Sequence, residues 1–251
     1  MSVKKFPARK AQQVDLSMML QNGALATGDW SPELLKSKAY EQILLDIILG
    51  ELPPGAKIDE QLLADHYGIG VAGVRDALAR LSLEGMVQRR ARSGTVVTSL
   101  DLIEVEQAFE VRHLLEPYAA GLAADKATPD QIAAIKSAFD GAEKAARNRS
   151  FRELVAMDQA FHRCVVVASH NLTLARIVIS LHHKAARYWY YSMTTRPEHD
   201  RLEDIAQHRA VAAAIEARDP DKAYAAMRCV LGDIPDSVRH SVRRTITDEI
   251  S

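Results

Sequence analysis

The stretch DEQLLADHYGIGVAGVRDALARLSLE, residues 59–84, decides the fold of the N-terminal third of this chain. It predicts a short helix capped by Asp59, a tight turn bracketed by Gly68 and Gly70, and a second helix over about residues 71–84. Apolar residues recur at helical spacing in both helices, so one side of each is expected to face a core. The residues predicted to face inward are Leu62, Leu63, Val74, Leu78 and Leu81.

The sequence on either side completes a winged helix-turn-helix. Before the pair, a helix is expected to begin at Ser31 and to end at Leu52, which two prolines and a glycine follow. After it, residues 86–90 and 95–98 predict two short strands of a positively charged hairpin. We therefore predict a mostly α protein with a winged helix-turn-helix, a DNA-binding fold, over residues 31–100.

The second helix of the motif is the expected recognition helix, whose first turns read base edges in the major groove. Arg75 is the leading candidate for a contact to guanine or phosphate, and a surface salt bridge with Glu60 is the alternative. Val71 and Ala72 suit the methyl group of thymine. The hairpin arginines are expected to bind phosphates or to flank the minor groove, with plain solvated charges as the alternative, and they are Arg89, Arg90 and Arg92, beside the wing glycine Gly94.

The net charge of −1 neither suggests nor excludes nucleic acid, because the basic residues are clustered. Residues 1–30 show no sustained periodicity and predict a flexible basic arm. Two interpretations stay open for it: a tail without a role, or an arm that touches DNA phosphates. Its basic residues are Lys4, Lys5, Arg9 and Lys10.

Residues 101–251 consist of alanine-rich amphipathic segments without a strand pattern, which predicts an all-α bundle of about six helices. The breaks between them are expected near residues 128, 149, 170, 196 and 219. With 47% hydrophobic and 26% charged residues, the composition is typical of a soluble globular protein. The sequence has no apolar run of membrane-spanning length and no recognisable export signal. Its two cysteines, Cys164 and Cys229, are too few for a disulfide framework. We therefore expect a cytoplasmic protein.

Several of these sequence motifs resemble those of a known family. Residues 44–98 resemble the DNA-binding domain of the GntR family, and the whole chain resembles its FadR-type subfamily, which has a helical C-terminal ligand-sensing domain of the FCD type. The matching stretches are ILGELPPG (48–55), Glu60, Leu63-Ala64, VRDAL (74–78), Leu81, EGMV (84–87) and Arg89 to Val97 with Gly94. The resemblance implies a homodimer that binds a double-stranded DNA operator under the control of an effector.

Two departures from the family pattern affect the DNA contacts. The family usually has arginine where this chain has Gln61, and Ser-Arg-Thr-Pro where it has residues 70–73, Gly-Val-Ala-Gly. Of the family's usual contacts, Arg75 and the wing residues carry over. The loss of two cationic contacts per protomer is expected to weaken phosphate binding and its dependence on salt. We predict an unusual operator sequence, with weaker DNA binding as the alternative.

A second set of candidates lies in the bundle. Asp158 and His162 are four residues apart and project from one face of a helix, and His208 lies in another apolar-sided helix. Carboxylate and imidazole groups that converge can bind zinc or nickel, but a histidine on an apolar face is more often a hydrogen-bonded core residue. The resemblance implies a metal at these three residues, because many members of the subfamily hold one with one aspartate and three histidines.

The fourth metal ligand is missing. The family pattern places its last histidine 22 residues after His208, where this chain has Val230. The neighbouring Cys229 is rotated by about 100° along a helix. His182 or His183 from another helix is the alternative, and so is water.

A sensor of small organic acids also needs a cation for the carboxylate, and Arg112 and Arg187 are the candidates. The alternatives are an ion pair between Arg112 and Glu116 and a surface charge for Arg187. The leading hypothesis is thus a DNA-binding repressor controlled by a small carboxylate. A metalloenzyme is the rival, but the sequence lacks an HExxH motif. A degenerate regulator that has lost its operator is the third hypothesis.

Overall fold

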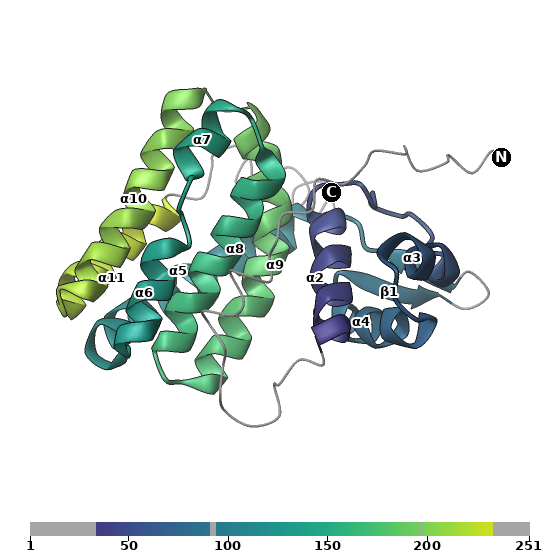
Figure 1. The fold of residues 1–251 in the computed structure, drawn as a ribbon, viewed down its shortest axis with the longest axis horizontal. Coiled ribbons are helices and arrows are strands. Elements are labelled where there is room, and N and C mark those ends of the chain that lie inside the picture. The colour runs from purple at the N-terminus through teal and green to yellow at the C-terminus, as the bar shows by residue number, and fades with distance from the viewer. Residues whose placement is uncertain (1–33, 91–93, 196, 233–251) are drawn as a thin grey trace, which may run out of the picture.

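The computed structural model describes residues 34–90, 94–195 and 197–232. The winged part contains α2 (Leu34–Ile48), α3 (Glu60–Tyr67), α4 (Val71–Leu83), β1 (Val87–Arg90) and β2 (Gly94–Val97). The bundle contains α5 (Leu102–Lys126), α6 (Pro129–Ser137), α7 (Ala142–Arg147), α8 (Phe151–Ala168), α9 (Leu172–Thr195), α10 (Glu198–Glu216) and α11 (Pro220–Leu231). The predicted fold class, a winged helix-turn-helix followed by a helical bundle, is therefore confirmed (Figure 1). None of the helices among the described residues is both long and apolar enough to span a membrane.

Local chemistry fixes the ends of the helix-turn-helix. The Asp59 carboxylate accepts hydrogen bonds from the backbone N–H groups of Gln61 and Leu62, at 3.0 and 3.1 Å, and so caps α3. Gly68 ends α3 in the left-handed conformation, with φ of 65°. Gly70 precedes α4 but has no side chain with which to cap it.

The predicted core residues of this motif are buried, with one exception. Leu63, Val74, Leu78 and Leu81 are at most 3% exposed, whereas Leu62 is 49% exposed. The inward position predicted for Leu62 is therefore wrong. Consecutive residues of a helix point about 100° apart, and α3 packs on α4 along the side that carries Leu63, so its neighbour faces solvent.

β1 and β2 form the antiparallel hairpin of the wing, with Val87 opposite Val97 and Arg90 opposite Gly94. Gly94 has φ of 80°, which a residue with a side chain rarely adopts. Arg92 and the basic arm over residues 1–30 lie outside the described residues.

As far as residue 232, the bundle has one helix more than expected, because the region between residues 128 and 148 forms two helices, α6 and α7. They are separated at Gly141, whose φ is 81°. α5 and α11 pack closely at Gly121, where an added Cβ atom would lie 3.4 Å from the carbonyl oxygen of Pro220. Four alanines of α5 are fully buried, and the first of them packs with Val166 and Leu174 of α8 and α9: Ala119, Ala120, Ala123 and Ala124.

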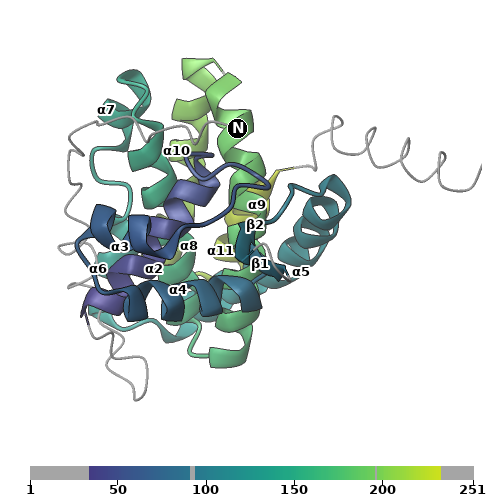
Figure 2. The ribbon, with the colours of Figure 1, turned by 90° about the vertical axis from the view of Figure 1, so that its right-hand side faces the viewer.

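The winged part lies on one side of the bundle, where α2 packs against α4 and also against α8 and α9 (Figure 1). In the view turned by 90°, α4 lies crosswise to the long helices of the bundle (Figure 2). The two parts therefore meet along α9.

Candidate functional site

The outer face of α4 carries the expected DNA contacts. Ala72 and Arg75 are exposed and Val71 is half-buried. The Arg75 side chain is 63% exposed, and its Nε atom lies 2.6 Å from a carboxylate oxygen of Glu60, which is the salt bridge considered as the alternative. This exposure leaves the guanidinium accessible to DNA, so the pair and a DNA contact do not exclude each other.

The other described DNA candidates are exposed as well. Arg89 and Arg90 project from β1, and Gln61 projects from α3, where its amide donates to Asp65 at 2.9 Å. A Cβ atom added to Gly70 or Gly73 would meet nothing within 4 Å. The N-terminal end of α4 is thus a smooth surface of small residues.

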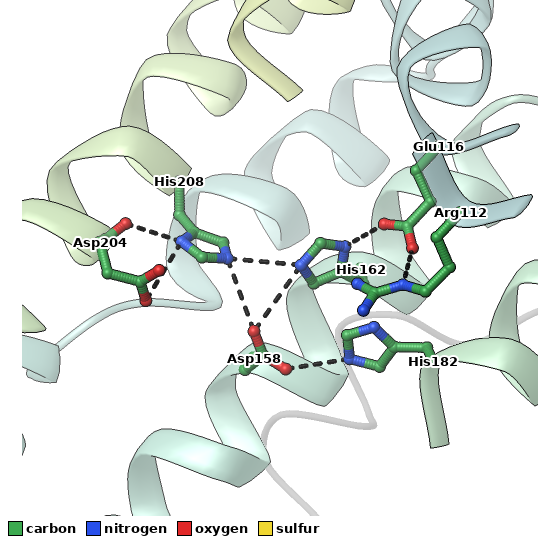
Figure 3. Close-up of polar contacts among 7 residues, drawn as sticks. All are labelled: Arg112, Glu116, Asp158, His162, His182, Asp204 and His208. Carbon is green, nitrogen blue, oxygen red and sulfur yellow. Dashed lines mark hydrogen bonds and ion pairs between the residues drawn. The ribbon is translucent and has the colours of Figure 1, made fainter. Parts of the chain in front are cut away.

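The second set of candidates converges inside the bundle (Figure 3). α8 contributes Asp158 and His162, and α10 contributes His208. All three side chains are at most 3% exposed. Asp158 Oδ1 lies 3.7 Å from His162 Nε2 and 3.5 Å from His208 Nε2, and the two nitrogens are 3.4 Å apart.

Two oxygen atoms orient the imidazole rings of this cluster. Glu116 Oε2 lies 2.5 Å from His162 Nδ1, and the backbone carbonyl oxygen of Asp204 lies 2.7 Å from His208 Nδ1. Because both oxygens accept hydrogen bonds, both Nδ1 atoms carry the proton, and in a neutral ring Nε2 is then an acceptor. Three acceptor atoms therefore face one another, an arrangement that a cation between them stabilises.

The spacing of these acceptors fits a metal ion. Ligand atoms about 2.1 Å from a tetrahedral zinc are about 3.4 Å from one another, close to the separations of 3.4 to 3.7 Å found here. Bonds from Nδ1 to a carboxylate or a carbonyl are also how histidine ligands are usually oriented. The donor set, one carboxylate and two imidazoles, suits zinc or nickel.

The electrostatics of the cluster favour ionised carboxylates. Burial opposes the ionisation of Asp158, but His182 and His208 hold its pKa well below the usual value. Burial likewise opposes ionisation of Glu116, and the guanidinium of Arg112 together with His162 lowers its pKa. Burial lowers the pKa of His208, but Asp204 and Asp158 raise it by more. The Asp158 carboxylate that would face a metal therefore also favours the charged form of His208.

His182 from α9 is the remaining histidine of the cluster. Its Nε2 atom lies 2.9 Å from Asp158 Oδ2, and its ring centre lies 4.4 Å from that of His162. Burial, followed by the charges of Arg112 and His162, lowers its pKa to about 4. Because Nε2 donates to Oδ2 of Asp158, His182 orients this carboxylate through the oxygen that does not face His162 and His208.

A cavity of about 40 Å³ adjoins the cluster. By the usual measure it holds a few water molecules or an ion. Arg112 reaches it from α5, with Nε 2.5 Å from Glu116 and the guanidinium 5.2 Å from the centre of the Phe109 ring. The ion pair with Glu116 is thus present, and it is buried. The remaining lining includes Ala186, Trp189, Asp204, Val230 and Leu231.

Three other candidates lie elsewhere. Arg187 is 5% exposed and donates to the Thr98 carbonyl oxygen at 3.0 Å, so it is neither in the cavity nor a surface charge. His183 bonds Glu84 at 2.8 Å in the contact between the two parts of the chain. Cys229 is exposed and does not line the cavity. Of the substitutes considered for the missing histidine, only His182 lies in the cluster.

Comparison with known proteins agrees with both halves of this description. The family described as "Bacterial regulatory proteins, gntR family" matches residues 35–97, and the FCD domain matches residues 107–233. The HTH-type transcriptional repressor GlaR of Escherichia coli (strain K12) is 30% identical over 200 residues, which cover 75% of this chain and 89% of that protein. The HTH-type transcriptional regulator LutR of Bacillus subtilis (strain 168) is 28% identical over 210 residues, covering 74% and 93%.

A solved structure shares the fold. E. coli McbR/YncC superposes with a TM-score of 0.67 at 19% identity, covering 78% of this chain and 93% of that one. The fold and these comparisons define a DNA-binding transcription regulator and not an enzyme. The chain belongs to the GntR family and carries a C-terminal FCD domain.

Glu116 and Asp204 are the residues of the site that sequence reasoning missed as orienting groups. Glu116 was considered only as a partner of Arg112, and its bond to His162 joins residues 46 positions apart. The local spacing of a single sequence carries no signal for such a contact.

Proposed function

We propose that this regulator is a repressor whose operator binding is controlled by a small organic acid held in the bundle beside a divalent metal. The observation that carries the proposal is the convergence of Asp158, His162 and His208 at the separations a metal imposes. The metal would be zinc or nickel, and it would supply a Lewis-acidic position for an oxygen of the acid.

Arg112 is the proposed partner of the carboxylate. It lines the cavity, and its Nε atom is already held by Glu116, which leaves its two terminal nitrogens without hydrogen-bond partners among the described residues. Such a pair of nitrogens suits two-pronged binding of a carboxylate. Because the cavity is only about 40 Å³, binding of an acid requires displacement of its water and a small outward movement of its walls. Arg187 belongs to the interdomain contact instead.

The DNA-binding surface is proposed to consist of α4, α3 and the wing. Arg75 would contact guanine or phosphate, Val71 and Ala72 would contact thymine methyl groups, and Gln61 would lie near the backbone. The wing residues Arg89, Arg90, Arg92 and Gly94 would bind phosphates, and Arg92 among them lies outside the described residues.

We infer that the protein acts as a homodimer through the outer face of α5. Val111, Leu114 and Tyr118 are 37%, 71% and 53% exposed and recur at helical spacing, so they form one apolar stripe. A second copy is the expected occupant, because two winged domains are needed to bind a two-fold symmetric operator. In sedimentation experiments, the wild-type protein should be a dimer and the Leu114→Glu variant should be a monomer. A monomeric wild-type protein would rule the dimer out.

The test of the function is genome-wide recovery of DNA fragments bound by the purified protein, with and without zinc. A short palindromic site recovered next to metabolic genes, with occupancy that changes with zinc, supports the proposal. Non-specific binding that falls steeply with salt would mean that the protein no longer recognises a specific operator, because of the changes at Gln61 and residues 70–73. This outcome would support the degenerate-regulator hypothesis. Specific operator binding that is the same with and without zinc would remove the metal from the proposal and would retain the assignment as a repressor.

A further inference from the structure

One segment of α9, residues 182–189, has two functional faces. His182, Ala186 and Trp189, spaced four and three residues apart, line the cavity of the bundle. His183 and Arg187, also four residues apart, lie on the other face and contact the winged part. A single rigid helix therefore forms both the wall of the cavity and the surface on which the DNA-binding part rests.

On its outer face, α9 contacts the end of the recognition helix. Glu84 is the C-terminal cap residue of α4. Its carboxylate lies 2.8 Å from His183 Nδ1 and accepts a hydrogen bond from the Tyr40 hydroxyl at 2.7 Å. Tyr40 and His183 are 7% and 6% exposed, and the guanidinium of Arg80, in the last turn of α4, lies 4.0 Å above the Tyr40 ring.

The second contact of this face is with the end of the wing. Arg187 donates to the carbonyl oxygen of Thr98 at 3.0 Å. Thr98 in turn donates through its hydroxyl to the carbonyl oxygen of Gly85 at 2.8 Å, directly after α4. α9 thus holds both the C-terminal end of the recognition helix and the strand end beside it.

On its inner face, α9 contacts the candidate metal cluster through the bond from His182 to Asp158 at 2.9 Å. We propose that the adjacent residues His182 and His183 couple the state of the cavity to the position of the recognition helix. A change at Asp158 shifts or turns α9, and the contact between His183 and Glu84 carries that displacement to α4. This inference rests on the proposed function, because it assigns the route by which occupancy of the cavity reaches DNA.

The coupling has a physical basis in the packing of these elements. Hydrogen bonds along a helix keep neighbouring residues in fixed relation, so His182 cannot move without His183. Of the groups that join α9 to α4, His183 and Tyr40 are buried and Glu84 is half-buried, and all three are paired, so breaking these contacts is costly. A displacement of α9 is therefore expected to carry α4 with it, rather than to leave the contact broken.

The experiment measures hydrogen exchange of the backbone in residues 76–86 of the full chain, after two perturbations of the cavity. One is saturating zinc, with its affinity measured by calorimetry, and the other is Asp158→Asn, which needs no ligand. In the wild-type background each should change the exchange rate by about threefold or more. In His183→Ala, which removes the contact with Glu84, the response should vanish, and in Tyr40→Phe, which removes only the hydroxyl bond to the same carboxylate, it should become smaller. Zinc affinity should stay within about twofold in both variants.

Tyr224→Phe, at an exposed tyrosine of α11, is the matched control and should respond like wild type. Tyr40→Phe keeps the ring beneath Arg80, so it provides a result even if His183→Ala does not fold. The proposal is overturned if Tyr40→Phe and His183→Ala both keep the full response, or if neither perturbation changes exchange in the wild-type background. If zinc does not bind but Asp158→Asn still changes exchange, the coupling stands and the metal is removed from the proposed function.

Discussion

The outer face of α4 and the interior of the bundle both depart from the pattern of the family, but the surroundings of the changed residues differ between the two regions. On α4, small residues at positions 70–73 leave an exposed surface whose neighbours need not rearrange. In the bundle, Val230 stands where a histidine is expected, and the remaining cluster is buried and linked by bonds to Glu116, His182 and Asp204.

The difference follows from whether water can reach the changed position. An exposed position that loses a polar side chain is filled by water, so function is lost without a structural penalty. A buried polar group that loses its partner has no water to replace it, so its neighbours must remain paired among themselves. The recognition surface is therefore free to change, whereas the buried cluster keeps its geometry through the bonds among its own members.

The largest expected effect is the loss of a metal ligand in the interior. His208→Gln removes one of the three converging acceptors, and zinc affinity should fall by about 100-fold or more. Calorimetric titration with zinc measures this change. His170→Gln, at a histidine bonded to Gln131 away from the cavity, should bind zinc like wild type. Equal affinities for His208→Gln and wild type would show that the cluster is a hydrogen-bonded core and not a metal site.

On the exterior, Arg75→Ala should weaken binding to the recovered operator by about 1–3 kcal/mol and relax specificity at one base pair. The cause is the loss of the one cation that α4 presents in its first turns. A fluorescence titration with operator variants checks the result. Arg147→Ala, at an exposed arginine of α7, serves as the control. A uniform loss across all operator variants would reassign Arg75 to a phosphate contact.

Val230→His sharpens the comparison by restoring the expected ligand to the interior. Val230 lines the cavity beside the three acceptors, so the new imidazole should tighten zinc binding by about tenfold. Competition with a chelator of known affinity measures the gain. An unchanged affinity would indicate that His182 or water already completes the coordination.

The smallest effect separates the two regions by stability alone. Gly73→Ala on the outer face of α4 should raise the free energy of unfolding by about 0.5 kcal/mol, because the added methyl group meets open space and alanine favours the helix. Gly121→Ala should gain less, since its methyl group would meet the Pro220 carbonyl oxygen at 3.4 Å and offset part of the same helix preference. Urea unfolding of the two variants provides the measurement, and an equal or larger gain for Gly121→Ala would contradict the distinction.

Much of the fold could be predicted because its signals are local. The apolar spacing of α3 and α4, the capping Asp59 and the wing glycine Gly94 each depend on a few neighbouring residues. The break between α6 and α7 also had a local signal, Asp140 followed by Gly141, which is typical of a turn. Leu62 was misplaced because a short helix offers two adjacent leucines, and only tertiary packing decides between them.

The site was predictable only in part, for a related reason. Asp158 and His162 share one helix face, so their proximity follows from spacing. The roles of Glu116 and Asp204 depend on how α5 and α10 pack against α8, which spacing within one helix does not encode. Arg187 and His183 are polar residues buried at the contact between two parts of the chain, and their sequence neighbourhood does not distinguish them from surface charges.

The close packing of α5 against α11 bears on how this protein could be re-engineered. Gly121 and the fully buried alanines of α5 leave little room for large side chains, so a library that enlarges these residues would mostly yield destabilised proteins. Ala186 and Val230, in contrast, border empty space at the cavity. Selection for biosensors that respond to a new inducer should therefore enrich substitutions at these two positions and leave the buried alanines of α5 unchanged.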